Sequence, residues 1–298
     1  MRQVTFAVGL AALCWWAIPA HAGTLRCPPD SVKVGNVCID TYEASVWQIP
    51  PSNTVLVKKV QQGKVTLADL TAAGATEVSL CANGAPQTPP ANFPIDGNWI
   101  PVPGSNPPSP GFYALSIPGV KPTACITWFQ ANQVCLLSGK RLLTNREWQG
   151  AAAGTPDPGV ADDGATTCVT RALTTVRDPV ETGSRSSCKS SWGVFDMVGN
   201  LAEFVADWAD QAFYYTQWTS STAGYNKITG DDMSAFGGPG YDETGATTPY
   251  NADPQFALPG VLVRGGGMHG DEFAGVFSVD ARYIPSDRNG DTGFRCAR

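Results

Sequence analysis

The number and placement of the cysteines most strongly limit how this chain can fold. Eight of its nine cysteines lie between Cys27 and Cys296, and the ninth, Cys14, lies in an apolar N-terminal segment. An even number of cysteines in an exported chain favours a framework of disulfides. Eight cysteines allow about 105 pairings. Closeness along the chain favours Cys27–Cys38 and Cys168–Cys188, and buried free thiols are the alternative.

The N-terminus has the pattern of a secretory signal peptide. Arg2 supplies the positive start, Val4–Ile18 is an apolar run, and residues 20–22 form a small-residue cleavage site. A run of about 15 residues is short for a membrane span, which needs about 20. We therefore expect residues 1–22 to be removed, and residues 23–298 to be secreted or periplasmic without membrane contact. A membrane anchor, or a lipoprotein attached through the cysteine of the apolar run, is the alternative.

Composition excludes several classes of function. The 298 residues carry a formal net charge of −6, which argues against a nucleic-acid partner. The 32 glycines and 24 prolines indicate much loop relative to regular structure. Of the two histidines, His21 leaves with the signal peptide, so His269 is the single histidine expected in the mature chain. A site that needs two histidines, such as a Cys₂His₂ zinc site or a two-histidine iron site, is therefore excluded.

Two helices are predicted in the middle of the chain. The first begins after Thr127, runs to about residue 138 and stops at Gly139. Its buried face holds Trp128, Ala131 and Cys135 at helical spacing. The second begins with the capping box of residues 144–147, buries residues 148, 151 and 152, and ends near residue 154.

Strands are predicted on either side of these helices. Residues 40–47 have strand character, with Tyr42 and Glu43 near the centre. A short hairpin is expected in residues 53–67. Residues 261–266 and 293–298 are expected to be strand ends of one sheet.

Four ordered blocks resemble the formylglycine-generating enzyme, or sulfatase-modifying-factor, domain family. They are VCIDTYEAS (37–45), GKRLLTNREWQGAA (139–152), GVFDMVGNLAEFVADW (193–208), and RGGGMH (264–269) with the terminal GFRCAR (293–298). The resemblance covers roughly residues 35–48 and 123–298. It implies an α+β, C-type-lectin-like fold, with a twisted antiparallel sheet, two helices and extensive loops.

The resemblance also implies how the chain is organised. Residues 23–298 are expected to form a single domain with a Pro/Gly-rich insertion at about 50–122. Lectin-like folds often tie the first helix to the last strand, which would pair Cys135 with Cys296. Cys81 and Cys125 would then remain as the fourth pair.

Copper is the cofactor that the family's catalytic members use, bound by two cysteines shortly after the RGG motif. Here no cysteine lies between Cys188 and Cys296, and Gly270 and Gly275 stand near the two copper positions. Copper(I) needs soft thiolate ligands. We therefore expect no copper and no formylglycine generation.

Calcium is the second ion that the resemblance implies, as a structural cofactor. The expected ligands are the carboxylates of Asp196 and Glu203 and the carbonyls of Gly199 and Leu201, a set of hard oxygens. In the alternative, Asp196 and Asn200 cap turns while Glu203 pairs with an arginine. A second calcium site of the family would fall in residues 155–190, where its ligands cannot be assigned.

A ligand groove is expected after the RGG motif. Its candidate residues are His269, Asp271, Glu272, Arg282 and Tyr283. The first three could also bind a metal, and a solvated turn is the alternative.

Two further sets of side chains have expected roles. Ion pairs around the sheet are the expected role of Asp280, Arg282, Asp287 and Arg288. A recognition surface or a satellite core is expected of Phe213, Tyr214, Tyr215, Trp218 and Tyr225.

The sequence thus favours an exported binding module or non-catalytic homologue. Its partner would be a protein, a peptide or a small molecule. The alternative is a periplasmic oxidoreductase or tailoring enzyme of the formylglycine-generating or pyoverdine-maturation type that uses other residues.

Overall fold

A computed structural model describes residues 25–50, 52–90, 93, 111–171, 178–210, 234–235, 259–281 and 283–298. Its helices are α1 (Thr54–Gln61), α2 (Leu67–Ala72), α3 (Trp128–Leu137) and α4 (Asn145–Ala151). Short 3-10 turns span Gly159–Ala161 and Asp271–Phe273. None of the helices in these ranges is long and apolar enough to cross a membrane.

The described strands form four sheets. The largest has the order β10-β12-β11-β9-β13, with β9 at Ala202–Asp210, β10 at Ser234–Ala235, β11 at Pro259–Gly265, β12 at Gly275–Asp280 and β13 at Thr292–Phe294. A second has the order β1-β2-β14-β8, with β1 at Ser31–Val34, β2 at Val37–Asp40, β8 at Arg141–Leu142 and β14 at Cys296–Ala297. A third joins β3 (Ser45–Gln48) to β4 (Thr76–Glu77) and β7 (Phe112–Leu115), and the fourth pairs β5 (Cys81–Ala82) with β6 (Ala85–Pro86). The fold is α+β and C-type-lectin-like, as expected, but the described chain has four helices where two were expected. The large sheet is mixed and not purely antiparallel, because β10 runs parallel to β12 and β13 runs parallel to β9.

Both predicted helices of the middle region are confirmed, together with their caps. Thr127 Oγ1 accepts from Gln130 N at 3.1 Å, while Thr127 N donates to Gln130 Oε1 at 3.0 Å. The same reciprocal pair joins Thr144 and Glu147 at the start of α4. Gly139 adopts a φ of +69° just after α3, the left-handed conformation with which helices commonly end.

The hairpin predicted for residues 53–67 is wrong. The segment forms α1 and the start of α2. Asn53 caps α1 through a hydrogen bond from Leu56 N, and a capping box at Thr66 opens α2. Leu56 and Val60 are both buried. Their separation of four residues is one helical turn, so helical periodicity outweighs the apparent strand pattern.

The single strand predicted for residues 40–47 is divided in two. Strand β2 ends at Asp40 and β3 begins at Ser45, and the two belong to different sheets. Tyr42 and Glu43 therefore lie in the connection, not at the centre of a strand. The C-terminal segment is divided similarly, because β13 pairs with β9 whereas β14 pairs with β2 and β8.

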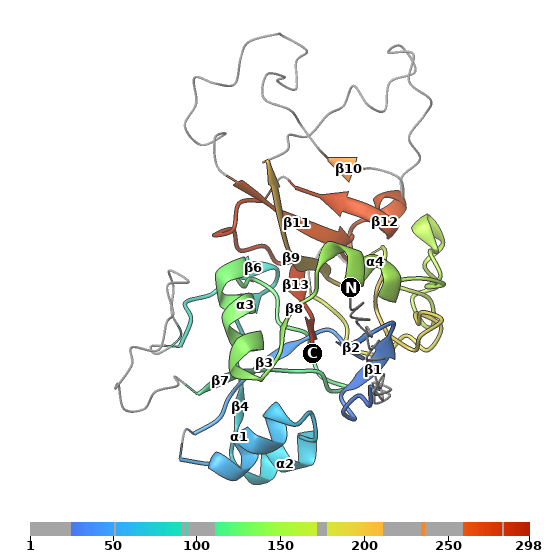
Figure 1. The fold of residues 1–298 in the computed structure, drawn as a ribbon. Helices are drawn as coiled ribbons and strands as arrows, with labels where there is room; N and C mark the ends of the chain where they lie inside the picture. Colours follow the sequence, from blue (N-terminus) through green and yellow to red (C-terminus); the bar gives the residue numbers. More distant parts are fainter. Residues whose placement is uncertain are drawn as a thin grey trace, which may run out of the picture.

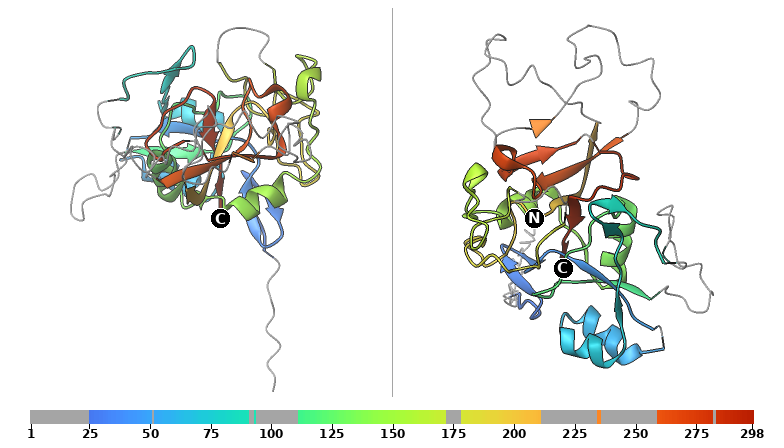
Figure 2. Two further views of the ribbon diagram at one scale, coloured as in Figure 1. Left: turned by 90° about the horizontal axis from the view of Figure 1, so that it is seen from above. Right: turned by 180° about the vertical axis from the view of Figure 1, so that it is seen from behind.

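Helices α1 and α2 cover the outer face of the third sheet. Side chains of β3 and β7 alternate between two cores, as the pleat of a strand requires. Val46 and Ala114 face the core shared with α3, whereas Trp47 and Tyr113 face the core that contains α1 and α2. In Figure 1, α1 and α2 lie at the end of the molecule opposite β11 and β12, and the rear view in Figure 2 shows the same separation.

The large sheet is likewise covered on both faces. Val261 and Val263 of β11 pack in the core that contains α3, and the intervening Leu262 packs in the core that contains α4. Arg264 also points toward α4, where its guanidinium lies 4.5 Å from the centroid of the Trp148 ring.

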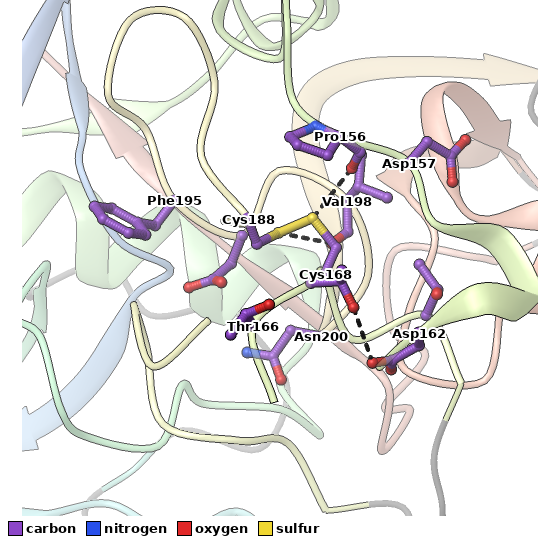
Figure 3. The surroundings of a disulfide bond; sticks show 12 residues. Pro156, Asp157, Asp162, Thr166, Cys168, Cys188, Phe195, Val198 and Asn200 are labelled. Carbon is purple, nitrogen blue, oxygen red and sulfur yellow. Dashed lines mark hydrogen bonds between the residues drawn. A yellow bond between two sulfur atoms is a disulfide. The ribbon is translucent and has the colours of Figure 1, made fainter. Parts of the chain in front are cut away.

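All eight described cysteines form disulfides. The four pairs are Cys27–Cys38, Cys81–Cys125, Cys135–Cys296 and Cys168–Cys188. This confirms the expected pairings and leaves no free thiol in the described part of the chain. The Cys168–Cys188 bond lies beside Pro156 and Val198 (Figure 3), and it closes the loop region that precedes residues 196–203.

Arg295, between β13 and β14, makes the central ion pair of the fold. Its Nε lies 2.8 Å from both carboxylate oxygens of Glu203, and its Nη2 lies 2.5 Å from Oε1. Trp148 Nε1 donates to Glu203 Oε2 at 2.8 Å. The remaining guanidinium hydrogens reach the carbonyls of Asp40, Phe195 and Asp196. Arg295 and Glu203 have side chains that are each only 1% exposed, so the pair is isolated from solvent.

Loss of the Cys135–Cys296 disulfide should destabilise the protein more than loss of Cys27–Cys38. The bonds close segments of 161 and 11 residues. The chain-entropy relation then gives contributions of about 5 and about 3 kcal/mol. We expect the double alanine variant of the longer pair to show the larger decrease in the free energy of unfolding in urea. Equal decreases for the two double variants would contradict this expectation.

Removal of the Arg295 guanidinium should be far more costly than removal of a surface cation. Arg295→Met leaves the Glu203 carboxylate buried without its partner, which should cost about 3–5 kcal/mol. Arg141→Met is the matched control, because Arg141 pairs with Glu147 while its side chain is 41% exposed. An exposed pair contributes about 0–1 kcal/mol. Equilibrium unfolding measures both variants, and similar losses would show that the Arg295 pair is not central to stability.

Candidate functional site

The loop of residues 196–203 is held by its own polar side chains. Asp196 and Asn200 have φ values of +57° and +55°, a conformation that Asp and Asn adopt more readily than most residues. Asp196 Oδ2 accepts from Gly183 N at 2.7 Å. Asn200 Oδ1 accepts from Val180 N at 2.9 Å. Both side chains therefore fix turns, as one of the two sequence hypotheses expected.

Gly199 brings this loop against the neighbouring segment at Val169. Its φ is +74°, and a Cβ placed there would lie 2.2 Å from the carbonyl oxygen of Val169. A larger residue would push the loop away from Val169. Figure 3 shows Asn200 and Val198 close to the disulfide that anchors the same region.

Glu43 is the residue of this region that the sequence reasoning missed. Its carboxylate is fully buried and accepts from Asn200 Nδ2 at 2.5 Å and from Leu201 N at 2.9 Å. Burial raises the pKa of Glu43 well above its usual value, and the nearby carboxylates of Asp196 and Glu203 raise it further. The available signal was an acidic residue within the apolar block VCIDTYEAS, which the sequence analysis assigned to a strand.

Three carboxyl groups thus share one buried guanidinium. Burial raises the pKa of Asp196 to about 6, while the hydrogen bond from Gly183 and the charge of Arg295 oppose the increase. Glu203 accepts three of the six hydrogen bonds that Arg295 donates. Burial and the surplus of negative charge favour the protonated form of Glu43, whereas Asp196, with a pKa of about 6, is protonated mainly below that pH.

The donor set does not fit a calcium ion held by both predicted carboxylates. The oxygens of Glu203 are occupied by Arg295 and Trp148, and Asp196 accepts from a backbone amide. Within the described ranges, no group of three or more His, Cys, Asp or Glu residues is arranged to hold a metal. The arginine pair considered for Glu203 is therefore what the structure shows. Calcium binding through Gly199 and Leu201 carbonyls stays a prediction that the structure does not test.

The stretch that would carry the second calcium site is also bonded internally. Asp163 accepts from the hydroxyls and backbone amides of Thr166 and Thr167 and from the amide of Ala165. These hydrogen bonds, led by that of the Thr166 side chain, hold the pKa of Asp163 well below its usual value. The geometry explains the turn without a metal, so we assign no ligands there.

A cavity of about 200 Å³ lies beside the glycine turn that follows β11. Its described lining comprises Ala202, Val263, Gly266, Gly267, His269, Gly270, Phe273, Ser278, Val279, Asp280, Tyr283, Asp291 and Thr292. The strands β9, β11, β12 and β13 all contribute. The cavity is therefore built on the large sheet and bounded on one side by the turn.

Two glycines of the RGGG motif are necessary for this shape. Gly266 has a φ of +72°, and a Cβ there would lie 2.6 Å from the Cα of Ala274. A Cβ on Gly267 would lie 2.9 Å from the carbonyl oxygen of Asp291. Close approach of the turn to these two segments brings His269 and Asp291 into the same cavity.

His269 is the most informative residue of the cavity. Its Nε2 atom is buried and has no hydrogen-bond partner among the described residues. A buried polar atom without a partner is costly unless another molecule supplies one. The imidazole can either donate or accept through this atom.

The structure brings together only part of the predicted groove. His269 and Tyr283 line the cavity. Asp271 is absent from the described lining, and its carboxylate lies 3.8 Å from Arg171 with the side chain 48% exposed. The side chain of Glu272 and the whole of Arg282 lie outside the described residues. Sequence reasoning missed the contributions of Ser278, Asp291 and Thr292, and it treated Asp280 only as an ion-pair residue.

The other predicted residues have different positions. Asp287 accepts from Ile284 N in a turn. Arg288 donates to the carbonyls of Cys125 and Gln87. These hydrogen bonds hold the backbone and are not the expected ion pair. The aromatic set between residues 213 and 225 lies outside the described residues.

The cavity offers no thiolate in its described part. Gly270 lines it, and Gly275 begins β12. All cysteines from Cys27 onward are in disulfides. Copper(I) requires soft ligands, so these residues do not fit the copper centre that the sequence resemblance raised.

Protonation of Asp196 should make the protein more stable at mildly acidic pH. The folded pKa is about 6, above the usual 3.8. The stabilisation that comes from protonating Asp196 is fully present below its usual pKa of 3.8, and it is lost as pH rises through the folded pKa of about 6. The free energy of unfolding of the wild type should therefore fall between pH 5 and pH 7.5. In Asp196→Asn this fall should be smaller by about 1 kcal/mol.

Urea unfolding at the two pH values measures this difference, and Glu181→Gln controls for the change in net charge at an exposed position. An identical pH dependence in wild type and Asp196→Asn would refute the assignment.

Known proteins resemble this chain both in sequence family and in fold. The sulfatase-modifying factor enzyme 1-like domain matches residues 20–298 of this chain. No curated protein matches it.

Three solved structures illustrate the range of similar folds. The P3c variant of the Major Tropism Determinant is 16% identical with a TM-score of 0.42, over 91% of this chain and 52% of that chain. PvdO from Pseudomonas aeruginosa is 16% identical with a TM-score of 0.34, over 88% and 80%. CarF is 14% identical with a TM-score of 0.38, over 90% and 92%. This chain thus spans about half the length of the tropism determinant.

The match to the family extends over nearly the whole chain and includes every part of the described cavity. The chain therefore belongs to the family defined by the sulfatase-modifying factor enzyme 1-like domain.

Proposed function

We propose that this protein is an exported, copper-independent member of its family that binds a ligand in the cavity around His269. The observation that carries the proposal is the buried Nε2 of His269, which has no partner in the described protein. The volume of about 200 Å³ is below the roughly 300–1,000 Å³ of drug-sized sites. It suits a small molecule or one side chain of a peptide.

Export is the second part of the proposal. The pattern of residues 1–22 and the four disulfides support it, because disulfides persist in oxidising compartments. A secreted or periplasmic location is consistent with both features.

The enzymatic alternative uses the same cavity. A tailoring role like that considered from the sequence would require His269 or Tyr283 to transfer protons, since the cysteines are cross-linked. A fold alone does not decide between binding and catalysis. The simpler role, recognition of a ligand by an imidazole and nearby hydroxyls, requires fewer additional groups.

The ligand proposal is tested by the NMR signals of His269 in the purified mature protein. We expect candidate small molecules and short peptides, when bound, to shift the imidazole resonances, which are assigned by their loss in His269→Gln. Phe277→Ala is the control variant, because Phe277 lies on β12, is 56% exposed and is absent from the described lining. Binding that survives His269→Gln but is lost in Phe277→Ala would place the ligand elsewhere and contradict the proposal.

Copper independence has its own test. Purified protein exposed to copper(I) should retain less than one ion per chain after dialysis and should leave the cysteine of a sulfatase-motif peptide unchanged, because the cavity lacks soft ligands. Mass spectrometry of the peptide and metal analysis of the protein measure the two results. Stoichiometric copper together with formylglycine formation would overturn the assignment.

A further inference from the structure

We propose that Lys140 and Asp40 become joined by an intramolecular amide bond in the mature protein. Lys140 Nζ lies 2.7 Å from Asp40 Oδ1, and the two side chains are each only 1% exposed. The two residues are 100 positions apart in the sequence, so the bond cross-links the chain in addition to its disulfides. Neither residue belongs to the described lining of the His269 cavity, so the modification is separate from the proposed ligand site.

The second sheet brings the two reacting groups together. Asp40 ends β2, Lys140 immediately precedes β8, and β14 lies between these strands. Strands β2 and β8 lie near the C-terminus in Figure 1. Lys140 N donates to Cys135 O at 2.9 Å, which holds the backbone of the lysine in place. Well-oriented groups within one molecule reach effective concentrations of about 10⁵–10⁸ M, so contact of this kind favours reaction within the pair.

A second carboxylate, that of Asp30, distinguishes this site from a simple ion pair. Asp30 Oδ2 lies 2.8 Å from Lys140 Nζ, and Arg298 Nη1 donates to both oxygens of Asp30 at 2.9 and 3.1 Å. Although burial opposes the shift, the charges of Lys140 and Arg298 lower the pKa of Asp30. Burial raises the pKa of Asp40 to about 6, against the charge of Lys140. Asp40 is therefore the carboxyl that more readily becomes neutral and electrophilic, whereas Asp30 stays ionised and can accept a proton.

The reaction needs no oxidant, reductant or added co-reactant. Transfer of one proton from the Lys140 ammonium to Asp40 Oδ1, along their hydrogen bond, gives a neutral amine and a neutral carboxylic acid. The amine lone pair then attacks Cγ of Asp40 and forms the C–N bond. Asp30 takes a proton from this nitrogen and delivers it to Oδ1. The bond from Cγ to Oδ1 breaks, one water molecule leaves, and Asp30 is again ionised.

A backbone amide is placed to assist the attack. Cys296 N donates to Asp40 Oδ2 at 3.2 Å. This oxygen remains as the carbonyl of the amide, and it carries the negative charge that develops when the amine attacks. A fixed N–H donor at such a position stabilises the developing charge. The disulfide between Cys135 and Cys296 holds this donor beside the pair.

Burial favours the amide over the ion pair. A buried ion pair must offset the desolvation of two charges, whereas the amide has no net charge. Asp30 and Arg298 remain paired with each other, so the reaction leaves no charge without a partner. Exclusion of water also protects the amide against hydrolysis.

Mass spectrometry of the full mature protein tests the proposal. After reduction of the disulfides, we expect the intact mass to be lower than the mass of the mature sequence by one water molecule. Trypsin should fail to cleave after Lys140. The digest should instead contain a branched peptide in which the Lys140 side chain is joined to Asp40. Fragmentation of that peptide locates the bond and distinguishes it from loss of water at another aspartate.

Three variants separate the roles of the groups. Lys140→Arg keeps the positive charge and removes the amine, so its mass should equal that of its sequence. Asp30→Asn removes the proton carrier and should lower the fraction of branched peptide at least tenfold. Lys59→Arg is the control, because Lys59 Nζ also lies 2.7 Å from a carboxylate, that of Asp69, but the two side chains are 44% and 26% exposed. The control should keep the loss of one water molecule, and circular dichroism establishes that each variant is folded.

The wild-type digest alone decides the main claim, so the test does not depend on the folding of any variant. A wild-type protein with the full sequence mass and ordinary cleavage after Lys140 would overturn the proposal, because the three groups would then form only an ion-pair network. A branched peptide that joins Lys140 to Asp30 would overturn the assignment of the electrophile. Either result leaves ligand binding at His269 untouched, since that site is tested by its own variants.

Discussion

The ion pair between Arg295 and Glu203 is the interaction on which the rest of the described structure depends. It joins the end of β13 to β9, and its guanidinium also reaches backbone carbonyls at Asp40 and in the 195–196 turn. A buried pair of this kind contributes little net stability compared with an apolar equivalent, but loss of one partner is strongly unfavourable. Its effect is therefore to specify which segments meet. The C-terminal strand, the loop before β9 and the first hairpin can satisfy Arg295 only when all three are in place.

A second buried cation, Lys140, likewise pairs with buried carboxylates, and one of these also binds the C-terminal Arg298. Lys140 Nζ lies 2.8 Å from Asp30 and 2.7 Å from Asp40, and Arg298 pairs with Asp30 at 2.9 Å. Burial raises the pKa of Asp40 to about 6, against the opposing charge of Lys140. Together with the Cys135–Cys296 disulfide, these contacts fix β14 between β2 and β8. The chain can thus pass from β13 in the large sheet to β14 in the second sheet while both strands stay fixed in their sheets.

Short-range patterns made parts of this fold predictable. The capping boxes at Thr127 and Thr144 act over three residues, so the sequence shows both partners at once. The family resemblance supplied the Cys135–Cys296 pairing, the fold and the place of the cavity. Glu43 could not be found in this way, because its partner Asn200 is 157 residues away. The same limit hid Asp291, whose position in the cavity depends on close packing against Gly267. The α1 region was assigned incorrectly because an eight-residue helix gives a weak periodic signal.

The disposition of the cysteines connects the fold to the chemistry of the cavity. The cysteines of the described chain are used to cross-link α3, the loops and the terminal strand. Redox chemistry by free thiolates is therefore not available to these residues. What remains at the cavity is an imidazole, hydroxyls, aromatic rings and two carboxylates. Such groups recognise charge and hydrogen-bonding pattern without changing oxidation state.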